Sequence, residues 1–89
     1  MLEKEFEIKN PTGLHLRPAG MLCDVAQKYD SHIYFTYHGN NEANAKSVLS
    51  ILGACIQYGD VIRLTVEGED EVAAMADLTH LFYTAFEEG

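Results

Sequence analysis

Positive charge is scarce in this 89-residue sequence. Six lysines and arginines stand against fourteen aspartates and glutamates, which gives a formal net charge of -8. No lysine or arginine follows Arg63, whereas seven acidic residues do. Binding along a nucleic-acid backbone requires cationic side chains for the phosphate contacts, so a nucleic-acid partner is not expected. Any anion-binding site should therefore lie in the first two thirds of the chain.

Cysteine is scarce as well, since only Cys23 and Cys55 are present and they are far apart. Without a CxxC spacing the sequence excludes a disulfide framework and a structural zinc site, and both cysteines are predicted to be small buried hydrophobic residues. The scattered His32, His38 and His80 have no metal-ligand spacing, and we interpret them as incidental. Neither a metal nor a cofactor is expected.

Long apolar runs are missing. No segment is long enough to cross a bilayer, and the charged start MLEKEFEIKN does not resemble a signal peptide. Internal repeats, linkers and low-complexity segments are missing too. We therefore expect one domain over residues 1–89, located in the cytoplasm without membrane insertion, and large enough for a single functional site.

The hydrophobic pattern of the first half predicts a strand followed by a helix. In LEKEFEIKN, Leu2, Phe6 and Ile8 share one parity, which is typical of a half-buried strand. Apolar residues at three- and four-residue spacing then predict a helix from Leu16 to Tyr29. Pro18 is compatible with this helix because it falls in the first turn.

Two more strands, a short helix and a fourth strand are predicted next. HIYFTY alternates, and the turn HGNN after it indicates a hairpin into a short strand at residues 42–45. Ser47 opens the apolar segment VLSILGACI, in which Gly53 could end a second helix. After the turn YGD, VIRLTVEG alternates again and predicts the fourth strand.

A last helix is predicted from about Asp70, with one buried stripe. The expected members of that stripe are Val72, Met75, Ala76, Thr79, Phe82 and Phe86. The element order is thus βαββαβα. An α+β fold, with a four-stranded antiparallel sheet and its three helices on one face, is the simplest way to bury one apolar side of every element.

The segment GLHLRPAG, residues 13–20, is the strongest candidate for a site. A helix that begins at or after His15 leaves its first backbone N–H groups unpaired, and this end of a helix attracts anions. Arg17 adds a planar charged group that matches phosphate oxygens, and His15 adds an imidazole that can accept a phosphoryl group. Spacing alone does not settle the function, because a plain helix start would explain the same residues.

This segment closely resembles the active-site segment of HPr, the family of histidine-containing phosphocarriers of the bacterial phosphoenolpyruvate-dependent phosphotransferase system. The family pattern G-[ILM]-H-x-R-P-A fits all seven residues from Gly13 to Ala19. A second segment, AKSVLSILGA, resembles the regulatory-serine motif of the family. Chain length and element order match along essentially the whole sequence, and the resemblance implies an open-faced β-sandwich.

The resemblance implies specific roles. His15 would accept a phosphoryl group from phospho-Enzyme I and pass it to a downstream Enzyme IIA-type acceptor, Arg17 would contact that group, and Pro18 would fix the first turn. Ser47, with Lys46 beside it, would be the site of a possible HPr kinase/phosphorylase, although serine is also a favoured N-cap. The protein would be a transiently phosphorylated carrier, not an enzyme, and a monomer is expected.

Apolar residues around the site are candidates for partner binding, although core packing would explain some of them equally well. The candidates are Leu16, Val48, Leu49 and Leu52. Leu49 and Leu52 stand where sugar-transport members of the family often carry methionine, few lysines surround the site, and the acidic C-terminal end resembles the nitrogen-related branch. These departures leave the partner set open.

Two other functions remain as alternatives at this point. A purely regulatory HPr-like module would depend on Ser47 and have a vestigial His15, but the intact His-x-Arg-Pro motif argues against it. A small acylphosphatase-type hydrolase would use an arginine in a phosphate loop, but it would leave His15 without a role.

Overall fold

The computed structural model describes residues 1–87 as one sheet with helices over one of its faces. The elements are β1 (Leu2–Glu7), α1 (Leu16–Gln27), β2 (His32–Tyr37), β3 (Asn41–Asn44), α2 (Val48–Gly53), β4 (Val61–Glu67), α3 (Glu71–Tyr83) and the 3-10 turn Ala85–Glu87. This is the predicted βαββαβα order, with β3 shifted one residue toward the N-terminus and α1 ending before Tyr29. The α+β open-faced sandwich is confirmed.

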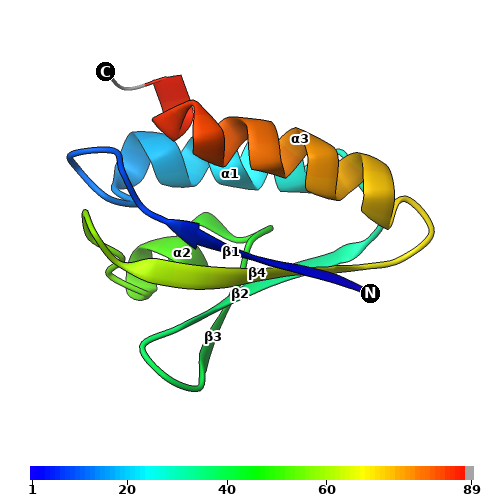
Figure 1. Cartoon of the computed structure of the whole chain (residues 1–89), viewed down its shortest axis with the longest axis horizontal. Helices are drawn as coiled ribbons and strands as arrows, with labels where there is room; N and C mark the ends of the chain where they lie inside the picture. Colours follow the sequence, from blue (N-terminus) through cyan, green and yellow to red (C-terminus); the bar gives the residue numbers. More distant parts are fainter. Residues whose placement is uncertain (88–89) are drawn as a thin grey trace.

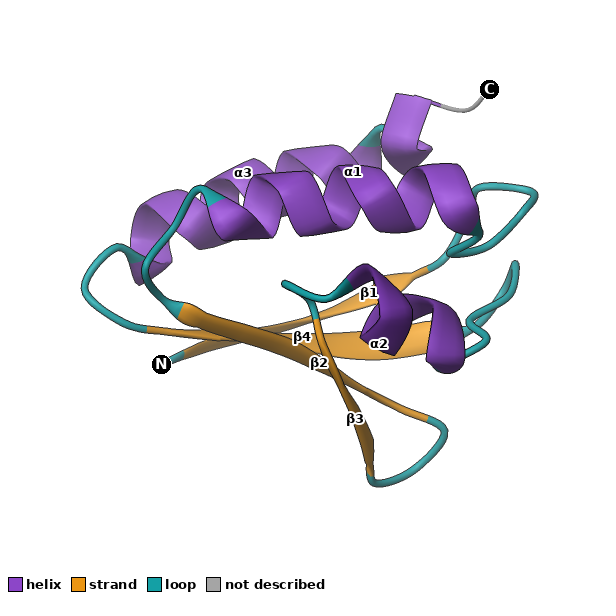
Figure 2. Ribbon diagram, turned by 180° about the vertical axis from the view of Figure 1, so that it is seen from behind, coloured by secondary structure: helices purple, strands orange, loops and turns teal. Residues whose placement is uncertain are grey.

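The sheet is antiparallel throughout, in the order β1-β4-β2-β3. Register pairs Phe6 with Ile62 and Phe35 with both Leu64 and Ala43, so one face of all four strands is apolar. Figure 1 and Figure 2 show α1 and α3 lying side by side over that face. The core therefore forms between one sheet face and the helices, as the alternating strands require.

The stripe predicted for the last helix is partly wrong. Met75, Phe82 and Phe86 are buried, but Val72 is 72% exposed and Ala76 is exposed as well. The helix instead buries Ala74, Leu78 and Leu81, and Phe86 reaches the core from the turn beyond α3. The reason is that α3 is apolar on nearly every side, so its sequence does not mark which side faces the sheet.

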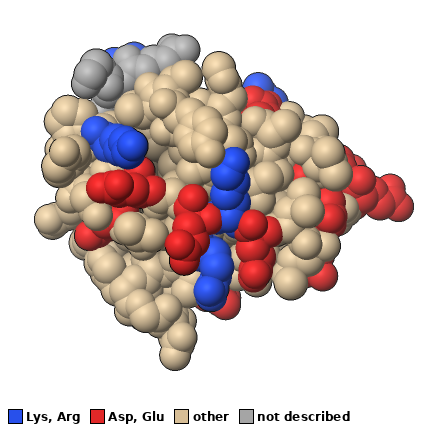
Figure 3. All heavy atoms as spheres, in the orientation of Figure 1, with Lys and Arg blue, Asp and Glu red and all other residues tan. Residues whose placement is uncertain are grey.

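The outward surface of α3 is correspondingly uncharged over much of its length. Figure 3 shows this face, with red and blue side chains gathered mainly below the helix and near its start. Within residues 1–87, no helix has both the length and the apolar character needed to cross a membrane.

Candidate functional site

The loop before α1 is held against the turn that precedes β4. The backbone N–H of Leu14 donates to the carbonyl oxygen of Ile56 at 3.0 Å, and Ile8 exchanges 2.8 Å backbone bonds with Gly59 and Asp60. Gly13 adopts φ +64°, and a Cβ placed there would lie 2.3 Å from the oxygen of Ile56. Only glycine fits this approach, which explains the first residue of GLHLRPAG.

His15 is the N-cap of α1, in extended conformation with φ -75° and ψ -168°. Its carbonyl oxygen accepts the N–H of Ala19 at 2.9 Å, which begins the helix, while its imidazole makes no capping hydrogen bond. The side chain is exposed. The ring is thus placed at a helix start without being used to stabilise it.

The first turn of α1 provides a favourable setting for an anion. It contains no acidic residue, and the side chain of Arg17, two residues after His15 in the sequence, is exposed. Leu16 and Arg17 are the first two helical residues, so their N–H groups have no partner within the helix, and Pro18, which follows them, is buried and has no N–H to leave unpaired. Two backbone donors and a guanidinium therefore belong to the turn that His15 begins.

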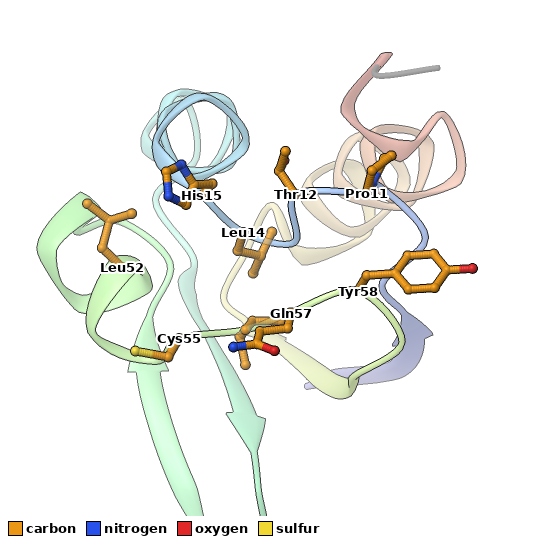
Figure 4. Close-up of a pocket in the computed structure, with 9 residues that line it drawn as sticks. Pro11, Thr12, Leu14, His15, Leu52, Cys55, Gln57 and Tyr58 are labelled. Atoms are coloured by element: carbon orange, nitrogen blue, oxygen red, sulfur yellow. The ribbon is translucent and has the colours of Figure 1, made fainter.

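An open groove of about 540 Å³ lies beside His15, between the loop at residues 11–15 and the segment at residues 52–58 (Figure 4). Its lining residues are Pro11, Thr12, Leu14, His15, Leu52, Cys55, Ile56, Gln57 and Tyr58. In Figure 4, His15, Leu52 and Cys55 lie toward one end of the groove and Tyr58 and Pro11 toward the other. The ring of His15 is therefore open to the surface of an approaching protein.

Cys55 corrects one prediction, because it is exposed whereas Cys23 is buried. Cys23 lies within α1, whereas Cys55 lies in a turn outside the helices and strands. Cys55 follows the C-cap of α2 with φ +54°, in the left-handed region, and its side chain is exposed although the neighbouring Ala54 and Ile56 are each only 3% exposed. The residues around Cys55 follow no helical or strand period, so the sequence does not predict a left-handed residue at this position.

The helix α2 begins at Ser47, as predicted. The hydroxyl of Ser47 accepts the N–H of Ser50 at 3.2 Å and caps the helix. Lys46 is fixed by the end of α1, because its Nζ donates to the carbonyl oxygen of Tyr29 at 2.6 Å and its own carbonyl accepts the Gln27 amide at 3.1 Å. Ser47 and Lys46 are both half-buried.

The four apolar candidates divide into two groups. Leu16 and Leu49 are 64% and 82% exposed, which core packing does not explain. Val48 and Leu52 are half-buried and pack against the core, while Leu52 also lines the groove beside His15. The structure thus brings the start of α1 and one end of α2 to the same groove.

The remaining histidines lie elsewhere. His32 and His38 belong to β2 and the turn after it, and His80 is on α3. The ring Nε2 of His38 lies 3.2 Å from Oδ2 of Asp60, which also accepts the backbone N–H of Gln57; this backbone bond, more than the histidine, lowers the pKa of Asp60. Among the described residues, no three His, Cys, Asp or Glu side chains gather as metal ligands.

Sequence reasoning did not identify the turn at residues 55–58 as part of the site. It reads only as turn chemistry around Gly59, and neither Gln57 nor Tyr58 stands in a periodic pattern. An aromatic residue beside the turn residues Gly59 and Asp60 was the available signal, and the structure leaves this residue, Tyr58, 67% exposed.

Comparisons with known proteins match nearly the whole chain. Residues 2–84 match the family model described as "PTS HPr component phosphorylation site". The phosphocarrier protein HPr of Xylella fastidiosa (strain Temecula1) is 38% identical over 88 residues, covering 99% of this chain and 98% of its own.

Solved structures agree with the sequence comparison. A crystal structure of HPr from Thermoanaerobacter tengcongensis superposes with a TM-score of 0.94 and 39% identity, covering 100% of this chain and 99% of that one. A structure described as an HPr dimer from the same organism has a TM-score of 0.75 and 40% identity, covering 97% of this chain and 98% of that one.

Proposed function

The chain belongs to the HPr family of phosphotransferase-system phosphocarriers, and from this premise we propose that His15 is the residue that carries the phosphoryl group. The chain is a carrier and not a catalytic enzyme, so the hydrolase alternative is set aside. The observation that carries the proposal is an exposed imidazole at the N-cap of α1, within the segment Gly13 to Ala19 and two residues before Arg17.

The proposed transfer is a simple exchange of bonds. The lone pair of a neutral ring nitrogen of His15 attacks the phosphorus of the donor, and a P–N bond forms as the bond between phosphorus and the donor group breaks, its electrons remaining with the donor. Arg17 and the unpaired N–H groups at the start of α1 stabilise the negative oxygens. Discharge to the acceptor reverses these steps, which suits a site that is open on one side.

The partners of the chain are components of the phosphotransferase system. We propose Enzyme I as the donor and an Enzyme IIA-type protein as the acceptor, both docking on the exposed Leu16 and Leu49 and on the neighbouring Val48 and Leu52. A single domain acting as a monomer in the cytoplasm fits this role, although one HPr in the comparison is described as a dimer.

Ser47 is proposed as a regulatory site, with an HPr kinase/phosphorylase as the modifying enzyme. Phosphate on Ser47 would carry about two negative charges at the start of α2. Leu52, five residues later on α2, lines the groove with His15. Five residues of helix span about 7.5 Å, which is within one Debye length at physiological salt, so the added charge acts at the docking surface.

Phosphorylation with phosphoenolpyruvate and Enzyme I tests the role of His15. Wild-type protein should acquire acid-labile, base-stable phosphate, and His15→Ala should acquire none. His80→Ala, which removes an exposed histidine of α3, is the matched control and should be labelled like wild type. Equal labelling of His15→Ala and wild type would place the phosphoryl group on another residue.

A further inference from the structure

The groove beside His15 has a composition that restricts what can occupy it. None of its nine lining residues, all within residues 1–87, is lysine, arginine, aspartate or glutamate. Leu14 and Ile56 form an apolar floor, each only 3% exposed. A charged side chain buried here would find no opposite charge, whereas an aliphatic or aromatic side chain would gain apolar contact.

The groove is continuous with the site of phosphoryl transfer because His15 forms part of its wall (Figure 4). Reacting atoms must approach to about 3–3.5 Å, so a partner that exchanges phosphate with the ring must close over it. A specific interface buries about 800 Å² on each protein, which is about one sixth of the 4978 Å² surface of this chain. Contact of that extent reaches well beyond the ring itself.

The far end of the groove presents Tyr58 on a well-braced turn. The N–H of Asp60 donates to the Gln57 carbonyl at 3.0 Å, and the Asp60 carboxylate accepts the N–H of Gln57 at 2.9 Å. The N–H of Gly59 donates to Ile8 at 2.8 Å, which fixes the turn to the end of β1. An exposed aromatic ring on a fixed backbone loses little conformational entropy when it binds, which is the usual character of an interface anchor.

We infer that phosphoryl donor and acceptor proteins grip the chain on both sides of His15, placing an uncharged aliphatic or aromatic side chain in the groove against Tyr58. This inference rests on the proposed function of His15. It adds the turn at residues 55–58 to the docking surface made by Leu16 and α2, and it makes Tyr58 a residue that determines partner affinity without touching the phosphoryl group.

Steady-state phosphorylation by Enzyme I tests the role of Tyr58. Tyr58→Ala should raise the KM for this protein about tenfold, a loss of about 1.4 kcal/mol that is ordinary for an aromatic anchor, with kcat unchanged. Tyr58→Phe, which keeps the ring, should recover most of the affinity. Val72→Ala is the control, since Val72 is 72% exposed on α3, which begins at the opposite end of the molecule from the start of α1 (Figure 1).

Chemical modification of Cys55 provides a second test that requires no substitution in the groove. N-ethylmaleimide should react with the exposed Cys55 and not with the buried Cys23, placing an adduct in the groove. Transfer should slow more than tenfold, whereas treatment should not change the rate of a Cys55→Ser protein.

The outcomes separate the two proposals. If His15 is labelled normally while Tyr58→Ala keeps a KM within twofold of wild type, or the Cys55 adduct is phosphorylated at the wild-type rate, the groove is not a docking surface. If wild-type protein is never labelled on His15, the proposed function fails and the inference fails with it.

Discussion

Replacing Gly13 with alanine tests whether the close contact between the two loops of the site has been assigned correctly. The new Cβ would lie 2.3 Å from the Ile56 oxygen and 2.7 Å from the Gln57 Cα, both backbone atoms that no side-chain rotation can move away. The loops must therefore separate, which stretches the 3.0 Å bond between Leu14 N–H and Ile56. The change acts on the wall of the groove that carries His15.

The magnitude follows from three contributions. Left-handed φ costs alanine about 1–2 kcal/mol, forced overpacking about 1–3 kcal/mol and a weakened hydrogen bond about 0.5–1.5 kcal/mol. A loss of about 3–6 kcal/mol is a large part of the roughly 4–13 kcal/mol expected for a domain of this size. Gly13→Ala should therefore be severely destabilised or unfolded at 25 °C.

Urea denaturation followed by circular dichroism measures this loss, with Gly20→Ala as the matched control from the same segment. Gly20 lies inside α1, and a Cβ there meets nothing within 4 Å. Its replacement should stabilise the protein by about 0.5–1 kcal/mol through helix propensity alone. A Gly13→Ala protein that loses less than about 1 kcal/mol would refute the assigned contact.

Two further predictions concern charge. Ser47→Asp and Ser47→Asn both retain a good N-cap for α2, but only the aspartate adds charge, so only Ser47→Asp should slow phosphorylation of His15; equal rates in initial-rate assays would contradict electrostatic regulation. The pKa of Asp70 is lowered first by the hydroxyl of Ser31 and then by the N–H groups of Asp30 and Ser31. The ionised Asp70 carboxylate therefore stabilises the fold above its unfolded pKa near 3.8, and this stabilisation is lost as the pH falls through its lower pKa in the folded protein. The difference in urea midpoint between wild type and Asp70→Asn should consequently shrink from pH 7 to pH 2. A difference that is independent of pH would show that the carboxylate is not responsible.

Local patterns were sufficient to predict the strands β1, β2 and β4 and the start of α2. Phe6, Ile33 and Leu64 alternate with polar residues, and a period of two has only one assignment to buried and exposed sides. Ser47 was identifiable as an N-cap because capping depends on residues within a single turn.

The buried side of α3 and the exposure of Cys55 could not be predicted from the sequence, because both depend on contacts between distant segments. Val72 and Ala76 are exposed although their spacing suits a buried stripe, because Ala74, Leu78 and Leu81 form a second apolar stripe on α3 and contact with the sheet decides between the two. Cys55 is exposed because the chain takes a left-handed turn after α2, a feature that its neighbours in sequence do not encode.

By itself, the sequence determined the βαββαβα order and the chemistry available at His15 and Arg17, since residue type, periodicity and a helix start are local properties. Only the tertiary structure decided that residues 55–58 lie across a groove from His15, because backbone hydrogen bonds between segments more than forty residues apart hold the two loops together. The glycine at position 13 is where the two levels meet. The motif specifies a glycine at this position, and the structure explains why: the backbone of Ile56 and Gln57 lies too close to leave room for a Cβ.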